Sequence, residues 1–284
     1  MISLRSHRFT YRIADLLLSL EGKLHRRLFG YLMDIAWPLI SDRDRFMRVT
    51  VGELELLVDL REGADREVWH GRYHPALQAF MESNLSAGDV FMDVGANIGQ
   101  ISVIAANLVG HRGQVLALEP NPALVRRLRV LATTNPRQNL EVLATAAGET
   151  SGVAELIVSS SHPYSTLEPA ELPGYPVEGK VAVSVRTVDQ IIEERGLARV
   201  RVLKIDAQGY ENRVILGARR SIEANKIDSV VIEASPSGFE EVRAILEVAG
   251  LRPCARSGSG LEPLGERDVR WGEDLFFLGP SITA

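Results

Sequence analysis

Short apolar runs alternate with helical patterns through most of the chain after residue 89. The runs that predict buried strands are residues 90–95, 114–120, 140–146, 201–206 and 229–235. Helical patterns separate or follow them, as at residues 98–109 and 122–133. Continuous apolar strands separated by helices are typical of a parallel sheet that is covered on both faces. A last run, residues 274–279, predicts a strand that returns antiparallel at an edge or inserts into the sheet.

The first 80 residues follow a different pattern. Residues 10–40 look helical, and residues 46–60 alternate between apolar and polar positions around a turn at Gly52-Glu53. Residues 75–87 predict a helix that leads into the main domain. We therefore expect an N-terminal helical and β-hairpin extension over residues 1–80 and an α/β domain over residues 81–284.

Residues 159–180 interrupt the alternation of strands and helices. The segment is rich in Ser, Gly and Tyr and contains Pro163, Pro169, Pro173 and Pro176. It predicts a long loop, and a loop of that length in a compact domain is usually functional or disordered.

Composition narrows the class of protein. The chain has 284 residues, 45% of them hydrophobic and 24% charged, with a formal net charge of −5. These values are ordinary for a globular protein, and an acidic chain does not suit a generic nucleic-acid binder. Cys254 is the single cysteine of the sequence, so neither an intrachain disulfide nor a zinc site built from cysteines is expected. We expect a cytoplasmic protein in a reducing compartment.

The N-terminal segment leaves a question about membranes open. Residues 1–30 carry six Lys/Arg against two Asp/Glu, and no apolar stretch reaches the roughly 20 residues that a membrane-spanning helix needs. A basic, leucine-rich helix within residues 1–40 can lie on a membrane surface or pack on the main domain with a solvated basic face. A homodimer contact through the extension is a further alternative.

The strongest signal for chemistry is Asp93-Val94-Gly95-Ala96-Asn97-Ile98-Gly99-Gln100, at the end of an apolar strand and the start of a helix. Glycine lets the backbone turn tightly and lets a ligand approach closely. Helix N-terminal amides can bind an anionic group such as a carboxylate, and an acidic residue at the strand end can meet a cationic amine. The spacing is not G-x-G-x-x-G, which disfavours a dinucleotide site.

A second signal is Glu119-Pro120-Asn121-Pro122, after the next strand. Glu119 follows Gly99 by 20 residues, where an acidic side chain hydrogen-bonds the two hydroxyls of a ribose. Pro122 suits the first turn of the following helix. Together the two motifs imply a ligand with a ribose and an amino acid-like end, and S-adenosylmethionine meets both requirements.

With these motifs the chain resembles the FkbM family of S-adenosylmethionine-dependent methyltransferases, over roughly residues 70–280. The resemblance also rests on Ala146-Ala147-Gly148, on the string LKIDAQGYE at residues 203–211 and on VIE at residues 231–233. It implies a Rossmann-like, doubly wound, mostly parallel seven-stranded sheet. It also implies transfer of methyl to a hydroxyl, typically on a natural product or a sugar. The chain departs from the family at Tyr73-His74-Pro75, where the family pattern has Glu in place of His74, so no family role is carried over to that position.

The resemblance implies a set of cofactor-binding residues: Asp93, Gly95, Ala96, Asn97, Gly99, Glu119, Asn121, Ala146, Ala147 and Asp206. The residues of the first motif would hold the methionine end. Glu119 would bind the ribose, Asn121 the adenosine, and the two alanines would lie beside the adenine. Asp206 would face the reactive centre, with Gln208, Tyr210 and Glu211 in the turn beyond it.

Methylation of an aliphatic hydroxyl calls for a base within hydrogen-bond reach. The candidate catalytic residues are Asp206, Glu233, Glu211 and His162, with His74 as a further candidate. Oxygen ligands from the three carboxylates would suit Mg²⁺. However, the charge of Glu211 at a helix start has a structural role in stabilising the helix dipole. Because the sequence shows no compact ligand cluster, we assign no metal ligands and do not expect dependence on Mg²⁺.

Other functions stay open at this point. A nicotinamide-dependent oxidoreductase could use the same sheet, although the sequence has no Tyr-x-x-x-Lys. A non-catalytic, membrane-peripheral binding module could keep the fold. Residues 174–180 match G-x-x-x-x-G-K, but Val181 replaces the Ser/Thr of a phosphate loop. His70 and His74 lack a third ligand nearby in sequence and read as a surface pair. The expected partner is a small-molecule or glycan acceptor, and no nucleic acid is expected.

Overall fold

The computed structural model describes residues 46–51, 54–60, 62–69, 71, 73–135, 137–159, 164–168, 176–235, 238–257, 260–265 and 269–283. The helix predicted within residues 10–40, the turn at Gly52-Glu53 and the candidate base His162 lie outside these residues. The chain divides into two compact units, residues 1–49 with 57–73 and residues 50–56 with 74–284. None of the helices in the described part has the length and hydrophobicity that crossing a bilayer would require.

The predicted hairpin is present as a two-stranded sheet of β1 (Phe46–Val51) and β2 (Leu54–Asp59). A short helix that the sequence analysis did not predict, α3 (Gly63–Trp69), follows in the first unit. The buried Asp65 carboxylate accepts a hydrogen bond from the backbone N–H of Asp59 at 2.6 Å. Arg66 donates to the carbonyl of Leu60 at 3.1 Å. These local bonds fix α3 against the end of β2.

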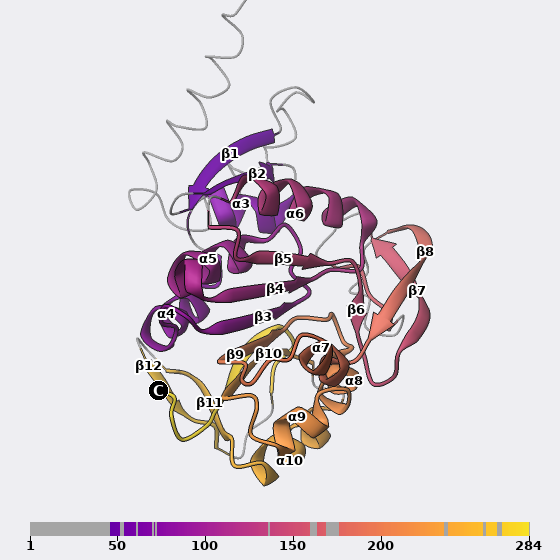
Figure 1. Cartoon of the computed structure of the whole chain (residues 1–284). Coiled ribbons are helices and arrows are strands. Elements are labelled where there is room, and N and C mark those ends of the chain that lie inside the picture. Colours follow the sequence, from indigo (N-terminus) through magenta and orange to yellow (C-terminus); the bar gives the residue numbers. More distant parts are fainter. Residues whose placement is uncertain are drawn as a thin grey trace, which may run out of the picture. The chain divides into compact units, whose positions relative to one another are not determined.

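The second unit is built on an eight-stranded sheet of order β12-β11-β13-β10-β9-β3-β4-β5 (Figure 1). Its strands in that order are β12 (Gly260–Pro263), β11 (Arg252–Ser257), β13 (Glu273–Leu278), β10 (Ser229–Ala234), β9 (Val202–Ile205), β3 (Val90–Val94), β4 (Gln114–Leu118) and β5 (Leu140–Leu143). The strands from β10 to β5 are parallel. Strand β13 inserts antiparallel between β10 and β11. The predicted mostly parallel α/β sheet is confirmed. It has one strand more than the seven expected, because β12 folds back on β11 as an edge hairpin.

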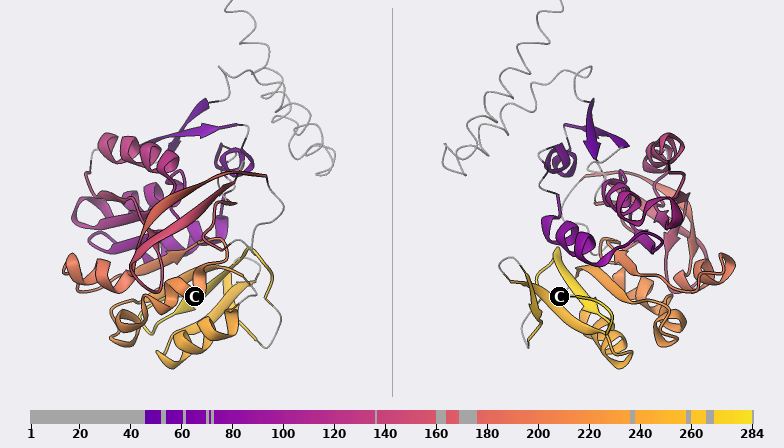
Figure 2. Two further views of the ribbon diagram at one scale, coloured as in Figure 1. Left: turned by 90° about the vertical axis from the view of Figure 1, so that its right-hand side faces the viewer. Right: turned by 60° about the vertical axis from the view of Figure 1, so that its left-hand side comes forward.

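Helices cover both faces of this sheet, as a doubly wound fold requires (Figure 2). They are α4 (Pro75–Asn84), α5 (Gln100–Val109), η2 (Gly110–Arg112), α6 (Pro122–Thr134), α7 (Val188–Glu194), α8 (Glu211–Leu216), α9 (Arg219–Glu223) and α10 (Phe239–Val248). Successive strand residues point to opposite faces. Met92 and Val94 of β3 therefore join the core formed with α7, α8, α9 and α10. Asp93 points to the other face, where Ser102 of α5 bonds to it.

A separate three-stranded sheet of order β6-β8-β7 follows β5 in the chain. Strand β6 (Ala146–Ala147) pairs parallel with β8 (Val177–Arg186), which runs antiparallel to β7 (Gly152–Ser159). Strands β7 and β8 were not predicted from the sequence, and residues 177–180 were expected in the loop. Both strands are largely exposed over their outer halves, so they lack the continuous apolar run of the central strands. Lys180 lies in β8 and pairs with Glu155 of β7 at 2.6 Å, which removes it from any phosphate loop.

Candidate active site

An open pocket of about 590 Å³ lies at the carboxyl ends of β3, β4 and β9, where open α/β sheets bind ligands. This volume includes space that is open to solvent at the mouth of the pocket. Of the residues expected to bind a cofactor, the pocket is lined by Gly95, Asn97, Glu119, Ala146, Ala147 and Asp206. Apolar side chains such as Leu118, Leu124 and Leu156 complete the wall.

Glu119 joins the two sequence motifs through its carboxylate. One oxygen accepts a hydrogen bond from the backbone N–H of Asn97 at 3.0 Å, and the other accepts from Asn121 at 2.8 Å. The residue is only 6% exposed and faces the pocket. A carboxylate has about four lone-pair sites. Glu119 therefore joins both loops and presents its carboxylate to the pocket.

The two motif glycines are required by the protein's own packing. Gly95 has φ +74°, and a Cβ there would collide with the backbone carbonyl of Asp206. Gly99 has φ +91°, and a Cβ there would lie 2.6 Å from a methyl carbon of Leu128 and 2.8 Å from one of Leu131 on α6. Loop-to-loop and loop-to-helix contact, rather than space for a ligand alone, explains these glycines.

Four of the expected cofactor residues lie outside the pocket lining. Asp93 is fully buried, accepts a bond from Ser102 Oγ at 2.6 Å, and pairs with Lys204 Nζ at 3.2 Å. The cationic amine that this carboxylate meets in the structure is thus a lysine of the neighbouring strand. Asn121 caps α6 by accepting a bond from the Ala123 N–H at 2.9 Å. Ala96 and Gly99 are buried in the turn itself.

Two residues that line the pocket each have a buried side-chain oxygen without a hydrogen-bond partner among the described residues. Asn97 adopts φ +52°, and its Oδ1 is buried without a hydrogen-bond partner among the described residues. Gln208 adopts φ +51°, and its Oε1 is likewise buried without a hydrogen-bond partner among the described residues. Both residues line the pocket. Buried polar atoms are normally paired, so these acceptors, together with Glu119, fit a ligand that carries donors such as an ammonium group and hydroxyls.

Asp206, which lines the pocket, lies next to the carboxyl group of Glu233. Gln208 Nε2 donates to Asp206 Oδ1 at 2.7 Å and to Glu233 Oε2 at 2.8 Å. Burial would raise the pKa of Asp206, but the charge of Lys204 and hydrogen bonds from Glu233 and Gln208 lower it below its ordinary value. Burial and the negative charge of Asp206 raise the pKa of Glu233. Glu233 therefore holds the proton, and Asp206 carries the charge.

Glu211 follows Asp206 in the sequence, but its carboxylate binds backbone N–H groups of the turn after β9. Its carboxylate accepts hydrogen bonds from the N–H groups of Ala207 at 2.8 Å and Gly209 at 3.1 Å, at the start of α8. Burial raises the pKa of Glu211 to about 7 despite these bonds. Glu211 does not line the pocket. Its position suits the shaping of the turn that carries Asp206 and Gln208.

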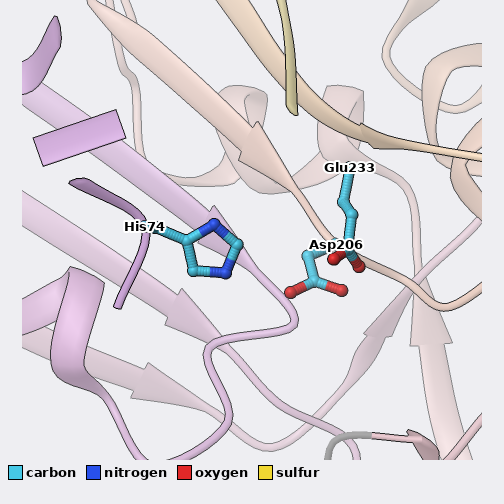
Figure 3. Close-up of side chains that lie close together, drawn as sticks. All are labelled: His74, Asp206 and Glu233. Atoms are coloured by element: carbon cyan, nitrogen blue, oxygen red, sulfur yellow. The ribbon is translucent and has the colours of Figure 1, made fainter. Parts of the chain in front are cut away.

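His74 is mostly buried, whereas the sequence predicted a surface position for it. Residue 70 lies outside the described residues, and His74 packs at the start of α4 with its side chain only 17% exposed. Its Nδ1 lies 3.0 Å from Asp274 Oδ2. Burial alone would lower the pKa of His74, but the hydrogen bond and charge of Asp274 raise it. The imidazole faces Asp206 and Glu233, as Figure 3 shows.

Part of the predicted loop reaches the pocket. Ser165, Thr166 and Leu167 line it. The buried Thr166 hydroxyl donates to the carbonyl of Gln208 at 2.7 Å, and its backbone bridges to Ile157 of β7. This segment therefore ties the three-stranded sheet to the turn after β9.

The polar residues of the site follow the alternation of the strands. Asp93 and Lys204 are register partners on β3 and β9, and Glu233 and Asp274 are register partners on β10 and β13. The sequence analysis missed Lys204 and Asp274 as site residues. Each is a charged residue within an otherwise apolar strand, which the sequence does show. However, the pairing of Lys204 with Asp93 and of Asp274 with Glu233 follows from the strand register, which only the fold gives.

A family model for the methyltransferase FkbM domain matches residues 93–253, which is more than half of the chain. The chain belongs to the FkbM methyltransferase family. The match begins at Asp93 and ends in β11, so it includes the pocket and the Asp206–Glu233 pair. The expected FkbM resemblance is confirmed.

Individual proteins are also similar to this chain. The hexuronic acid methyltransferase AglP of Haloferax volcanii is 25% identical over 149 residues, which are 51% of this chain and 55% of AglP. The 31-O-demethyl-FK506 methyltransferase FkbM of Streptomyces tacrolimicus is 31% identical over 200 residues, which are 60% of this chain and 75% of the relative. The chain therefore spans about half the length of AglP. A crystal structure of an FkbM methyltransferase from Methylobacillus flagellatus aligns at 21% identity and TM-score 0.45, over 67% of this chain and 43% of that chain.

Proposed function

We propose that the chain is an S-adenosylmethionine-dependent O-methyltransferase that acts on a hydroxyl of a natural product or a sugar. The observation that carries the proposal is the pocket at the ends of β3, β4 and β9, lined by Asn97, Glu119 and Asp206. Family membership supports methyl transfer. One relative is named for a hexuronic acid and another for an O-demethylated compound, which supports an acceptor oxygen on a sugar or a natural product.

The side chains that line the pocket have the hydrogen-bonding groups and apolar surfaces that S-adenosylmethionine requires. Glu119 offers acceptors for a ribose, and the unpaired Oδ1 of Asn97 offers one for an ammonium group. The small side chains of Ala146 and Ala147 leave a flat apolar wall for an adenine. S-adenosylmethionine, when bound, supplies an activated methyl group, so the protein's main task is to position the acceptor.

We assign the proton acceptor to Asp206. It lines the pocket, and its lowered pKa keeps it ionised. Glu233, which holds a proton, and Lys204, 3.5 Å from Asp206, fix the carboxylate in place. A carboxylate within hydrogen-bond reach can take the hydroxyl proton as attack proceeds. Glu233, Glu211 and His162 are the other candidate bases. Among them Glu233 lies beside Asp206, and Glu211 is bonded to backbone amides.

Calorimetric titration with S-adenosylhomocysteine and, separately, with NAD⁺ tests the cofactor. We expect one S-adenosylhomocysteine per chain and no heat from NAD⁺. NAD⁺ binding without S-adenosylhomocysteine binding would establish the oxidoreductase alternative. Incubation with radiolabelled S-adenosylmethionine and extracts of the source organism then tests the acceptor. Label should enter a small molecule or glycan, and base-stable label on an oxygen would establish an ether rather than an ester or amine product.

A further inference from the structure

Four titratable side chains gather on one face of the sheet beside the pocket: His74, Asp206, Glu233 and Asp274. They come from segments far apart in the chain, namely the start of α4, the end of β9, β10 and β13. One ligand atom each of His74, Asp206 and Glu233 lies within 4.8 Å of the others. Figure 3 shows the imidazole of His74 beside the carboxyl groups of Asp206 and Glu233, which lie next to each other.

The orientation of His74 is the second observation. Its Nδ1 bonds to Asp274 Oδ2 at 3.0 Å, and the opposite edge of the ring faces Asp206 (Figure 3). A histidine that binds a metal nearly always bonds its other ring nitrogen to a carboxylate or carbonyl, which fixes the ring and its tautomer. Glu233 and Asp274 are register partners, so the sheet itself aligns the histidine's partner with one of the carboxyl groups that it faces.

Asp206 and Glu233 are adjacent carboxyl groups that share the amide of Gln208, whose Nε2 lies 2.7 Å from Asp206 Oδ1 and 2.8 Å from Glu233 Oε2. Lys204 Nζ lies 3.5 Å from Asp206 Oδ2, on the Asp206 side of the pair. A divalent cation that displaces the proton of Glu233 would be bound by both carboxylates, because metal ligands must be deprotonated.

We propose that His74, Asp206 and Glu233 bind a divalent transition-metal cation, with Asp274 as the residue that positions His74. An imidazole with two carboxylates suits Mn²⁺, Fe²⁺, Co²⁺ or Zn²⁺, whereas Mg²⁺ prefers oxygen ligands alone. Gln208 completes the site. Rotation of its amide by half a turn would replace the Nε2 between the carboxyl groups by Oε1, which has no partner among the described residues.

A cation here would lie beside Asp206 at the edge of the pocket. It could polarise an acceptor hydroxyl and promote loss of its proton. This consequence rests on the proposed methyl transfer, whereas the binding site itself does not.

The test uses Mn²⁺ as the probe, with the full chain stripped of metal by a chelator. The electron paramagnetic resonance signal of free Mn²⁺ should fall as one ion binds per chain, and pulsed measurements should show coupling to an imidazole nitrogen. Glu233→Gln should lose most of the binding, and His74→Gln should lose the nitrogen coupling. Asp274→Asn should weaken affinity about 10–100-fold. Zn²⁺ should displace Mn²⁺ more readily than Mg²⁺ does.

Matched controls are His111→Gln and Glu223→Gln, which change an exposed histidine and an exposed glutamate elsewhere in the same unit. Both should bind Mn²⁺ like the parent. Circular dichroism and S-adenosylhomocysteine titration of each variant separate loss of the site from loss of the fold. Absence of Mn²⁺ binding at millimolar metal, or binding that keeps its nitrogen coupling in His74→Gln, would overturn the metal site. Either result would leave the methyltransferase proposal standing if S-adenosylhomocysteine still binds.

Discussion

A single carboxylate, that of Glu119, connects the two motifs from which a cofactor site was predicted. Glu119→Ala should weaken binding of S-adenosylhomocysteine by about 1.5–3 kcal/mol, the range for hydrogen bonds to a charged group. Glu119→Gln should have a smaller effect because it keeps one acceptor. Calorimetric titration measures both, with the exposed Glu149→Ala as the control. Parental affinity in both Glu119 variants would mean that this carboxylate serves only the loops.

Asp206 differs from Glu119 because its role is expected after binding. Asp206→Asn should lower kcat about 10²–10⁴-fold, the usual cost of losing a general base, with a much smaller change in acceptor KM. Steady-state kinetics with the identified acceptor measures this. Full turnover with poor cofactor affinity would instead assign Asp206 to the cofactor and Glu233 to the base. Loss of parental activity in EDTA, restored by Mn²⁺, would favour a metal-assisted version of the step.

Glu211 should give the protein a pH-dependent stability. Its pKa in the folded chain is about 7, against an ordinary value of 4.5. Between these values the folded chain keeps a proton that the unfolded chain has lost, so the free energy of unfolding falls as the pH rises. The contribution is on the order of 3 kcal/mol across this window. In urea unfolding at several pH values, Glu211→Gln should flatten this slope, and Glu223→Gln should leave it unchanged.

The turn between β3 and α5 is constrained by the protein segments that pack against it. Gly95→Ala should lower stability by about 1–3 kcal/mol, since it adds a strained φ and a collision with the Asp206 carbonyl. Gly99→Ala should cost less, because the ends of the Leu128 and Leu131 side chains can move. Gly152→Ala, which meets open space, is the control. Thermal unfolding measures all three, and an unchanged midpoint in Gly95→Ala would contradict the close approach seen here.

Burial decided which strands could be predicted from the sequence. Strands β3, β4, β9, β10 and β13 have buried apolar runs, and all were expected close to their observed bounds. Strands β7 and β8 stand partly in solvent and have no such run, so their pairing with each other was hidden. Pocket residues at strand ends were also predictable, because parallel strands end at one edge of the sheet. His74 and Asp274 could not be placed, because only the register and the packing of α4 bring them to Asp206.

The N-terminal segment of the chain carries an excess of basic residues. The basic segment within residues 1–40 predicts either attachment to a membrane surface or packing on the protein. If it binds membranes, the full chain should float with anionic liposomes at low salt and be released at high salt, since charge contributes to the attraction. A chain that lacks residues 1–40 should not float. Failure of the full chain to float would favour the packed alternative.

The alternation of the central strands sets a limit on how this protein can change. Asp93, Lys204, Glu233 and Asp274 share one face, while their immediate neighbours in sequence, apart from Glu273, belong to the core on the other. Deleting one residue from β10 would turn Glu233 into that apolar core and bring Ile232 or Ala234 to the pocket side. An insertion or deletion of an odd number of residues inside one of these strands would therefore move its polar site residues into the core and its core residues to the site. Length can vary freely only between the strands, and diversification of the acceptor should be sought there.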